Sequence, residues 1–225
     1  MSWLHIYQFY FMVNEHSRDY TDLILFEEAL NVMGEFQLLH NLLRHDYIVL
    51  VQLTDKYVNS PLEFFTLYNS CLIRLFTMIE ADMYGLYRLD PYPGKKATNF
   101  FHQFPNIFNQ ICSTWRKEDV KNNYFKNHWD ELCALKNLRN SFTHPKNRTH
   151  VLPATIADFK RLRDAWDNYN MFMGEITNNF YVGFRGNLND IDIDAIIKRK
   201  EEKGITLSQF TARVSWNTAS DNDVE

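Results

Sequence analysis

Residues 60–89 read SPLEFFTLYNSCLIRLFTMIEADMYGLYRL, and this stretch decides the fold class. Ser60, Pro61 and Glu63 stand where a helix favours a capping hydroxyl, a proline in the first turn and an acidic residue that completes a capping box. The apolar residues that follow recur at spacings of three and four, which predicts one buried helical face. These residues are Phe65, Tyr68, Leu72, Leu75, Ile79, Met83 and Leu86. We expect the helix to end before the loop-forming sequence Asp90-Pro91-Tyr92-Pro93-Gly94.

Two later stretches carry the same helical period. One begins near Glu118 or Asp119, and we expect it to end at about Phe142 or Thr143, because Pro145 disfavours the helical conformation of the residue before it. Its expected core face is Phe125, Trp129, Leu132, Leu135, Leu138 and Phe142. The other covers 155–178 and starts with a capping pattern at Thr155-Ile156-Ala157-Asp158. The sequence therefore predicts a mostly α protein with an antiparallel helical bundle at 58–180.

The bundle is flanked by two further segments. Residues 1–57 are rich in aromatic and aliphatic side chains and are expected to form a helical extension packed on the core, although Ile48–Leu53 could also be a short strand. A shorter helical segment is expected at 97–111. Residues 181–225 are expected to form an arm, with a charged helix at Asp194–Lys203, an edge or partner-binding segment at Ile205–Trp216 and a disordered end at Asn217–Glu225.

The composition agrees with a compact helical protein. The 225 residues are 45% hydrophobic and 16% aromatic, with only 7 Gly and 6 Pro. A net charge of −4 gives no global attraction to nucleic acid or to membranes, so any nucleic-acid site must be local. The N-terminus has no basic lead-in of a signal peptide, and we see no apolar run of the ~20 residues that cross a bilayer. With three scattered cysteines, these features predict a cytoplasmic protein.

A candidate site lies in residues 135–146, Leu-Lys-Asn-Leu-Arg-Asn-Ser-Phe-Thr-His-Pro-Lys. Arg139, Asn140 and His144 stand at the expected end of the 119–143 helix. An arginine can hold a phosphate through its rigid fork of donors, and a histidine can take or give a proton near neutral pH. The three residues thus form a set suited to cleaving a phosphodiester, although the spacing by itself is a weak signal.

The surroundings of this motif are positively charged. No Asp or Glu occurs from Leu132 to Ala157, whereas the same segment contains Lys136, Arg139, Lys146, Arg148, His144 and His150. One interpretation is a local RNA-binding surface, with Lys136, Lys146, Arg148 and His150 as its contacts. The other is a helix C-terminus carrying cations that complement the helix dipole, which is a common arrangement. Charge alone leaves both open.

The stretch Leu138-Arg139-Asn140-Ser141-Phe142-Thr143-His144 resembles the signature of the HEPN superfamily, many of whose members are ribonucleases. That signature is an Arg, four to six residues and a His, with a polar residue directly after the Arg, on a late helix of a bundle. The resemblance covers about 60–180. It implies metal-independent RNA cleavage without a cofactor, in a cleft shared by two subunits of a homodimer. It also implies a toxin or antiphage defence effector, with an antitoxin or defence-system partner protein.

By this resemblance His144 would act on the 2′-hydroxyl or the leaving oxygen, Arg139 would stabilise charge on the phosphate, and Asn140 would position one of them. Apolar residues near the motif, such as Phe142, would hold the dimer together. One position departs from the family. HEPN toxins controlled by a nucleotidyltransferase often have Tyr two residues after the His, and Lys146 stands there.

Other interpretations remain open. The chain could be a HEPN-like module that binds RNA or protein without catalysis, or a helical interaction module with a chance motif. Glu80 or Asp82 could reach Arg139 and orient it, or could be ordinary solvated charges. His40 and His45 lie five residues apart, which does not suit a metal pair on one helix, and we interpret them as surface or core histidines. No phosphate-binding glycine loop or metal-ligand cluster is evident.

Overall fold

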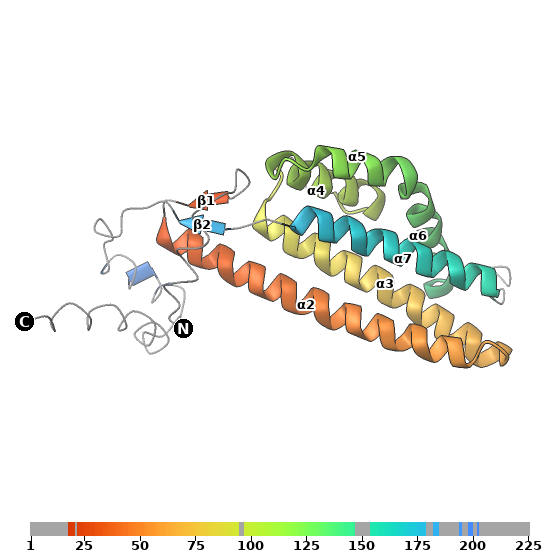
Figure 1. Cartoon of the computed structure of the whole chain (residues 1–225). Helices are drawn as coiled ribbons and strands as arrows, with labels where there is room; N and C mark the ends of the chain where they lie inside the picture. Colours follow the sequence, from red (N-terminus) through yellow and green to blue (C-terminus); the bar gives the residue numbers. More distant parts are fainter. Residues whose placement is uncertain are drawn as a thin grey trace, which may run out of the picture. The chain divides into compact units, whose positions relative to one another are not determined.

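The mostly α fold is confirmed by a computed structural model, which describes residues 18–20, 22–94, 97–146, 154–178 and 182–184, together with Asp194, Lys198, Arg199 and Glu202. The helices are α2 Leu23–Lys56, α3 Pro61–Leu89, α4 Phe100–Thr114, α5 Glu118–Asn127, α6 Trp129–Thr143 and α7 Ile156–Thr177 (Figure 1). Two three-residue strands, β1 Arg18–Tyr20 and β2 Val182–Phe184, pair with each other. The described residues form two compact units, one containing Arg18 and Glu28–Val182 and one containing Asp19–Glu27 with the residues described from Gly183 onward.

Helix α3 is the central helix of the larger unit, and its predicted bounds are confirmed. It contacts α4, α6 and α7, so its buried surface is wider than the single stripe expected from the sequence. Phe64 is buried, whereas Phe65 is half-buried. Ser60 is the N-cap and Pro61 follows it, but the Ser60 side chain makes no capping hydrogen bond. The predicted capping box at this helix is therefore wrong, and the Ser60 carbonyl accepts the Phe64 N–H at 2.8 Å in an ordinary first turn.

Helix α2 is continuous for 34 residues, so the strand alternative for Ile48–Leu53 is wrong. It packs on α3 and α7 within the larger unit. On α3, Gly85 meets Phe36 so closely that a Cβ atom at Gly85 would lie 2.7 Å from Phe36 Cδ2. On α7, the Tyr47 ring stacks on Trp166 with 3.8 Å between ring centroids. These contacts place α2 in the same hydrophobic core as the other helices of this unit.

The single helix expected at 119–143 is two helices, because the chain breaks at His128. His128 has φ −132° and ψ −13°, outside the helical region, and it ends α5 and precedes α6. The sequence around the break holds Asn127 and His128, residues of modest helix propensity. Both halves contact α7, where Tyr124 of α5 stacks on Phe172 at 4.1 Å between ring centroids, and α6 packs on α3 as well.

The start of α7 confirms the predicted capping box. The Thr155 hydroxyl accepts the Asp158 N–H at 3.1 Å, and the Asp158 carboxylate accepts the Thr155 N–H at 2.9 Å. The expected 97–111 segment is α4, which begins at Phe100. The calls on residues 1–17, on Ile205–Trp216 and on Asn217–Glu225 lie outside the described residues. So does most of the expected Asp194–Lys203 helix, whose four described residues are helical.

Among the described residues, α3 is one helix long and apolar enough to cross a membrane by length and composition. This corrects the expectation that no segment reaches that threshold. The central helix of a globular bundle passes the same test, and many apolar residues of α3 belong to the core that it shares with its neighbouring helices. The finding is therefore weak evidence for a membrane.

Candidate functional site

The motif lies at the C-terminal end of α6, which packing on α3 holds in place. Leu132 and Leu135 are buried in the core. At the end of the helix, the Phe142 ring makes edge-to-face contacts with Phe65 at 5.7 Å and with Tyr68 at 6.4 Å between centroids. The expectation that Phe142 would help to hold a dimer is not supported by these contacts, because its ring packs within its own chain.

The helix ends where Pro145 predicted. Thr143 is the last helical residue, and the His144 N–H donates to the Asn140 carbonyl at 3.0 Å. The Thr143 hydroxyl donates to the Arg139 carbonyl at 3.1 Å, which satisfies another carbonyl of the last turn. The His144 side chain is exposed and makes no hydrogen bond with any described residue. None of the described residues therefore fixes its ring orientation or tautomer.

Arg139 and Asn140 are joined directly. Arg139 Nη1 donates to Asn140 Oδ1 at 3.3 Å, and both side chains are half-buried. Arg139 Nε is buried and has no hydrogen-bond acceptor among the described residues. A buried donor without an acceptor costs about 1–3 kcal/mol, so such a group calls for an explanation such as a ligand or a bound water. The structure thus joins Arg139 to Asn140, but it places no hydrogen bond between either side chain and His144.

The positive segment contributes less to the surface than its sequence suggests. Lys136 is only 5% exposed, its ammonium is ion-paired with Glu80, and it lies 5.0 Å from the Phe76 ring centroid and 4.7 Å from that of Phe100. A buried, paired ammonium is a poor RNA contact, and we correct its assignment to a core position. Lys146 is exposed. Arg148 and His150 lie outside the described residues.

Neither carboxylate proposed to orient Arg139 does so. Glu80 is the partner of Lys136. Asp82 is 1% exposed and points to a different set of residues, so it is not a solvated charge either. His40 Nδ1 lies 3.0 Å from both Asp82 oxygens, and the Tyr169 hydroxyl donates to Asp82 Oδ2 at 2.9 Å.

This His40–Asp82–Tyr169 network is a second polar site, which sequence reasoning missed. Burial raises the pKa of Asp82, although the hydrogen bonds from His40 and Tyr169 oppose that shift. Burial also raises the pKa of Tyr169 well above its ordinary value, so Tyr169 is a neutral donor. A histidine fixed by a buried carboxylate has a defined orientation, which suits it to present its other ring nitrogen to a ligand.

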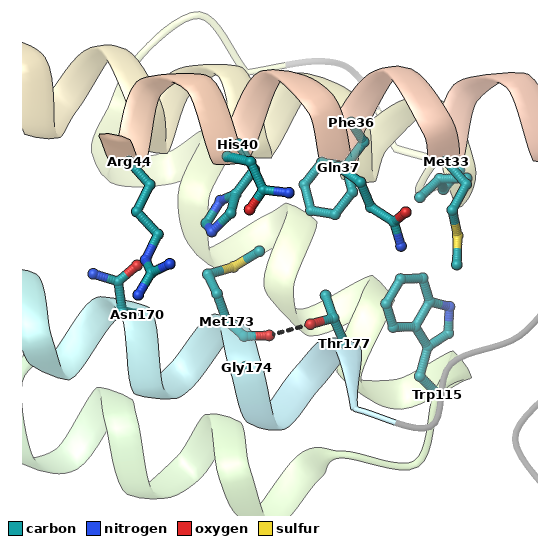
Figure 2. Close-up of a pocket in the computed structure, with 12 residues that line it drawn as sticks. Met33, Phe36, Gln37, His40, Arg44, Trp115, Asn170, Met173, Gly174 and Thr177 are labelled. Carbon is teal, nitrogen blue, oxygen red and sulfur yellow. Dashed lines mark hydrogen bonds between the residues drawn. The ribbon is translucent and has the colours of Figure 1, made fainter. Parts of the chain in front are cut away.

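His40 lies in the wall of a pocket of about 400 Å³ between α2 and α7 (Figure 2). Figure 2 shows Arg44, Asn170 and His40 grouped toward one end of the pocket and Trp115 with Met33 at the other. The only sequence signal for this site was a histidine on α2 and an aspartate within the apolar stretch of α3. Their 42-residue separation gave no reason to pair them.

Among the described residues, no group of three or more His, Cys, Asp or Glu side chains is placed to hold a metal ion. No protein-family model, curated protein or solved structure matches the chain. The function must therefore be argued from the two polar sites described above.

Proposed function

We propose that the chain is a metal-independent endoribonuclease of the HEPN type, which acts as a cytoplasmic homodimer in a toxin or antiphage defence system. The observation that carries the proposal is the Arg139–Asn140 pair, followed by an exposed His144 at the end of a bundle helix. The biological role, and an antitoxin or defence-system partner, follow from the resemblance of the motif to that family.

The chemistry needs only groups that the motif supplies. His144, or its copy in a second subunit, removes the proton from a ribose 2′-hydroxyl, and the oxygen attacks the adjacent phosphorus. The bond from phosphorus to the 5′-oxygen breaks, the departing 5′-oxygen takes a proton, and a 2′,3′-cyclic phosphate remains. Arg139 stabilises the negative charge that builds up on the phosphate during attack. Asn140 holds the Arg139 side chain through its Oδ1 atom.

A dimer would supply what one chain lacks. Because proton removal and proton donation are separate steps, a second proton-transfer group helps, and a two-fold axis brings the same surface together twice. His144 has no side-chain partner among the described residues, which leaves it available to a second subunit. Lys146 would stand at the rim of the shared cleft, where an exposed cation attracts the RNA backbone.

The first experiment measures cleavage of single-stranded RNA by the purified chain in EDTA. We expect cleavage with 2′,3′-cyclic phosphate or 3′-phosphate ends and no cleavage of DNA, which lacks the 2′-hydroxyl. His144→Ala and Arg139→Ala should each abolish cleavage with unchanged circular dichroism. His45→Ala and Arg163→Ala are matched controls, because both side chains are exposed and lie outside the motif. Full activity in both motif variants would contradict the assignment.

The composite site has its own test. A mixture of His144→Ala and Arg139→Ala subunits should recover part of the activity, because a mixed dimer still contains one intact His144 and one intact Arg139. If light scattering shows a fully active monomer at micromolar concentration, the hypothesis of a cleft shared by two subunits is wrong and the enzyme acts as a single chain.

A second candidate function is a HEPN-like module that binds RNA or protein without catalysis. It is favoured by the exposed His144 ring, which no described side chain holds in a reactive orientation. RNA binding by the wild-type chain that is weakened in Arg139→Ala, without cleavage under any of the conditions above, would select this alternative.

A further inference from the structure

The pocket between α2 and α7 is built from one face of each helix. Its α2 wall contains Met33, Phe36, Gln37, His40, Asn41 and Arg44, spaced alternately three and one apart, and its α7 wall contains Asn170, Met173, Gly174 and Thr177. From Met33 to Arg44 the α2 wall is about 16 Å long at a rise of 1.5 Å per residue. A pocket of about 400 Å³ is within the range that holds small organic ligands.

One end of the pocket is suited to a negative charge. His40 is held from behind by Asp82, so its other ring nitrogen is left for the pocket side. Arg44 is exposed and forms no ion pair or hydrogen bond with any described residue, and Figure 2 shows it beside Asn170. None of the described residues that line the pocket is acidic. The Arg44 guanidinium is therefore not neutralised by any described residue that lines the pocket.

The opposite end is apolar. Met33 on α2 is half-buried and offers accessible apolar surface there, whereas Trp115 and Phe36, which also line this end, are only 2% and 8% exposed (Figure 2). A flexible methionine side chain adapts its contact to an apolar group. The pocket thus has a cationic end at Arg44 and an apolar end at Met33 along the same helix face.

A glycine keeps the pocket open. Gly174 lies in the α7 wall, and a Cβ atom added there would find nothing within 4 Å. Glycine weakens the interior of a helix relative to almost any other residue. Its position in this wall therefore leaves space that a side chain would otherwise fill.

We propose that this pocket binds a small organic anion, in which a phosphate or carboxylate group is held by His40 and Arg44 and an apolar body lies against Met33. The inference is independent of the ribonuclease proposed above, because it involves none of the motif residues. The pocket matches the ligand in charge at one end and in polarity at the other.

The test is titration calorimetry of the full chain with four probes: 2-naphthyl phosphate, 2-naphthoate, inorganic phosphate and neutral 2-naphthol. We expect one naphthyl anion to bind at a single site, at least tenfold more tightly than either inorganic phosphate or 2-naphthol. The tighter of the phosphate and the carboxylate identifies the anionic group. If neither naphthyl anion binds at millimolar concentration, or if 2-naphthol binds as tightly as they do, the proposal is wrong.

Variants locate the binding site. Gly174→Leu should fill the pocket and abolish binding, whereas Gly34→Leu, the same substitution on α2 with open space around its Cβ but outside the pocket lining, should bind within twofold of the wild type. Arg44→Gln should weaken binding about tenfold, because it removes a charge-assisted contact. Lys56→Gln removes an equal charge from the exposed end of α2 and should have no effect.

Circular dichroism establishes that each variant is folded, and neither Gly174→Leu nor Arg44→Gln removes a contact between described residues. Unchanged binding in folded Gly174→Leu would exclude the pocket as the site. Unchanged binding in Arg44→Gln would refute the role given to the cationic end.

Discussion

The contact between Gly85 and Phe36 predicts that Gly85→Ala will destabilise the fold, whereas Gly34→Ala and Gly174→Ala will stabilise it. In Gly85→Ala the new Cβ would lie 2.7 Å from Phe36 Cδ2, 3.1 Å from Phe36 Cβ and 3.2 Å from Phe36 Cγ. Rotation of the ring cannot relieve all three contacts, because Phe36 Cβ is fixed to the α2 backbone. Helix α2 must therefore move away from α3 by several tenths of an ångström.

The magnitude follows from two opposing terms. Replacing a helical glycine by alanine gains about 1 kcal/mol from helix propensity. Overpacking a close helix contact costs about 1–3 kcal/mol. For Gly85→Ala we expect a net loss of about 0–2 kcal/mol in the free energy of unfolding. At Gly34 and Gly174 a Cβ meets nothing within 4 Å, so the same substitution there should gain up to about 1 kcal/mol.

Urea denaturation followed by circular dichroism measures all three variants. The difference between Gly85→Ala and either control should be about 1–3 kcal/mol, which corresponds to several degrees in Tm for a chain of this size. If Gly85→Ala is as stable as Gly34→Ala, the close packing of α2 on α3 is refuted.

Three further predictions concern caps and buried charges. Thr155→Ala should cost about 1 kcal/mol, because the Thr155 hydroxyl caps α7. Ser60→Ala should leave stability nearly unchanged, because the Ser60 side chain makes no capping hydrogen bond. Equal losses of stability for the two variants in urea denaturation would contradict this. His40→Ala should cost about 3 kcal/mol near neutral pH, because it leaves the buried Asp82 carboxylate with one hydrogen-bond partner fewer. Burial raises the pKa of Asp82, so the folded state binds the proton of this carboxyl more tightly than the unfolded state does. The contribution of Asp82 to stability therefore falls as the pH rises from its unfolded-state pKa through its folded-state pKa. The destabilisation caused by His40→Ala should accordingly shrink toward acidic pH. In the Asp82→Asn background the same substitution should have a cost that does not depend on pH. A cost that persists at acidic pH, or one that still varies with pH in the Asp82→Asn background, would contradict the network. Glu80→Ala should cost about 3 kcal/mol, because it leaves the buried Lys136 ammonium unpaired. Lys136→Met should change stability by less than about 1.5 kcal/mol, because it keeps the packing against Phe76 and leaves a half-exposed Glu80 hydrated. If Lys136→Met is the more destabilising of the two in thermal denaturation, the ion pair is not the main interaction of Lys136.

The elements that depend on local sequence were predictable. The bounds of α3 follow from Pro61 at one end and Asp90-Pro91 at the other, and the Thr155 capping box follows from four adjacent residues. The break at His128 was not predictable in this way, because Asn and His reduce helix propensity only slightly. It depends on Tyr124 packing against α7 while the following helix contacts α3.

The candidate motif was visible because its residues are adjacent in sequence, whereas the His40–Asp82 pair depends on α2 packing on α3. A count of positive residues along the chain does not show which helix face each residue occupies, so it predicts an exposed Lys136 although that side chain is buried. Lys136 stands four residues after Leu132 and one after Leu135, within the expected core face, and that spacing was a signal of burial.

The Tyr47–Trp166 stack makes the packing of α2 on α7 observable by near-ultraviolet circular dichroism and tryptophan fluorescence. Trp166 is one of five tryptophans, and its ring lies 3.8 Å from an aromatic ring that belongs to a different helix. Separation of α2 from α7 would expose both rings to water and change the near-ultraviolet circular dichroism and the tryptophan emission, even if every helix kept its backbone hydrogen bonds. A spectral change at these wavelengths, at lower urea than the loss of far-ultraviolet signal, would therefore reveal undocking of α2 as a separate step. If the early spectral change is absent in Trp166→Phe, the change comes from the Tyr47–Trp166 pair.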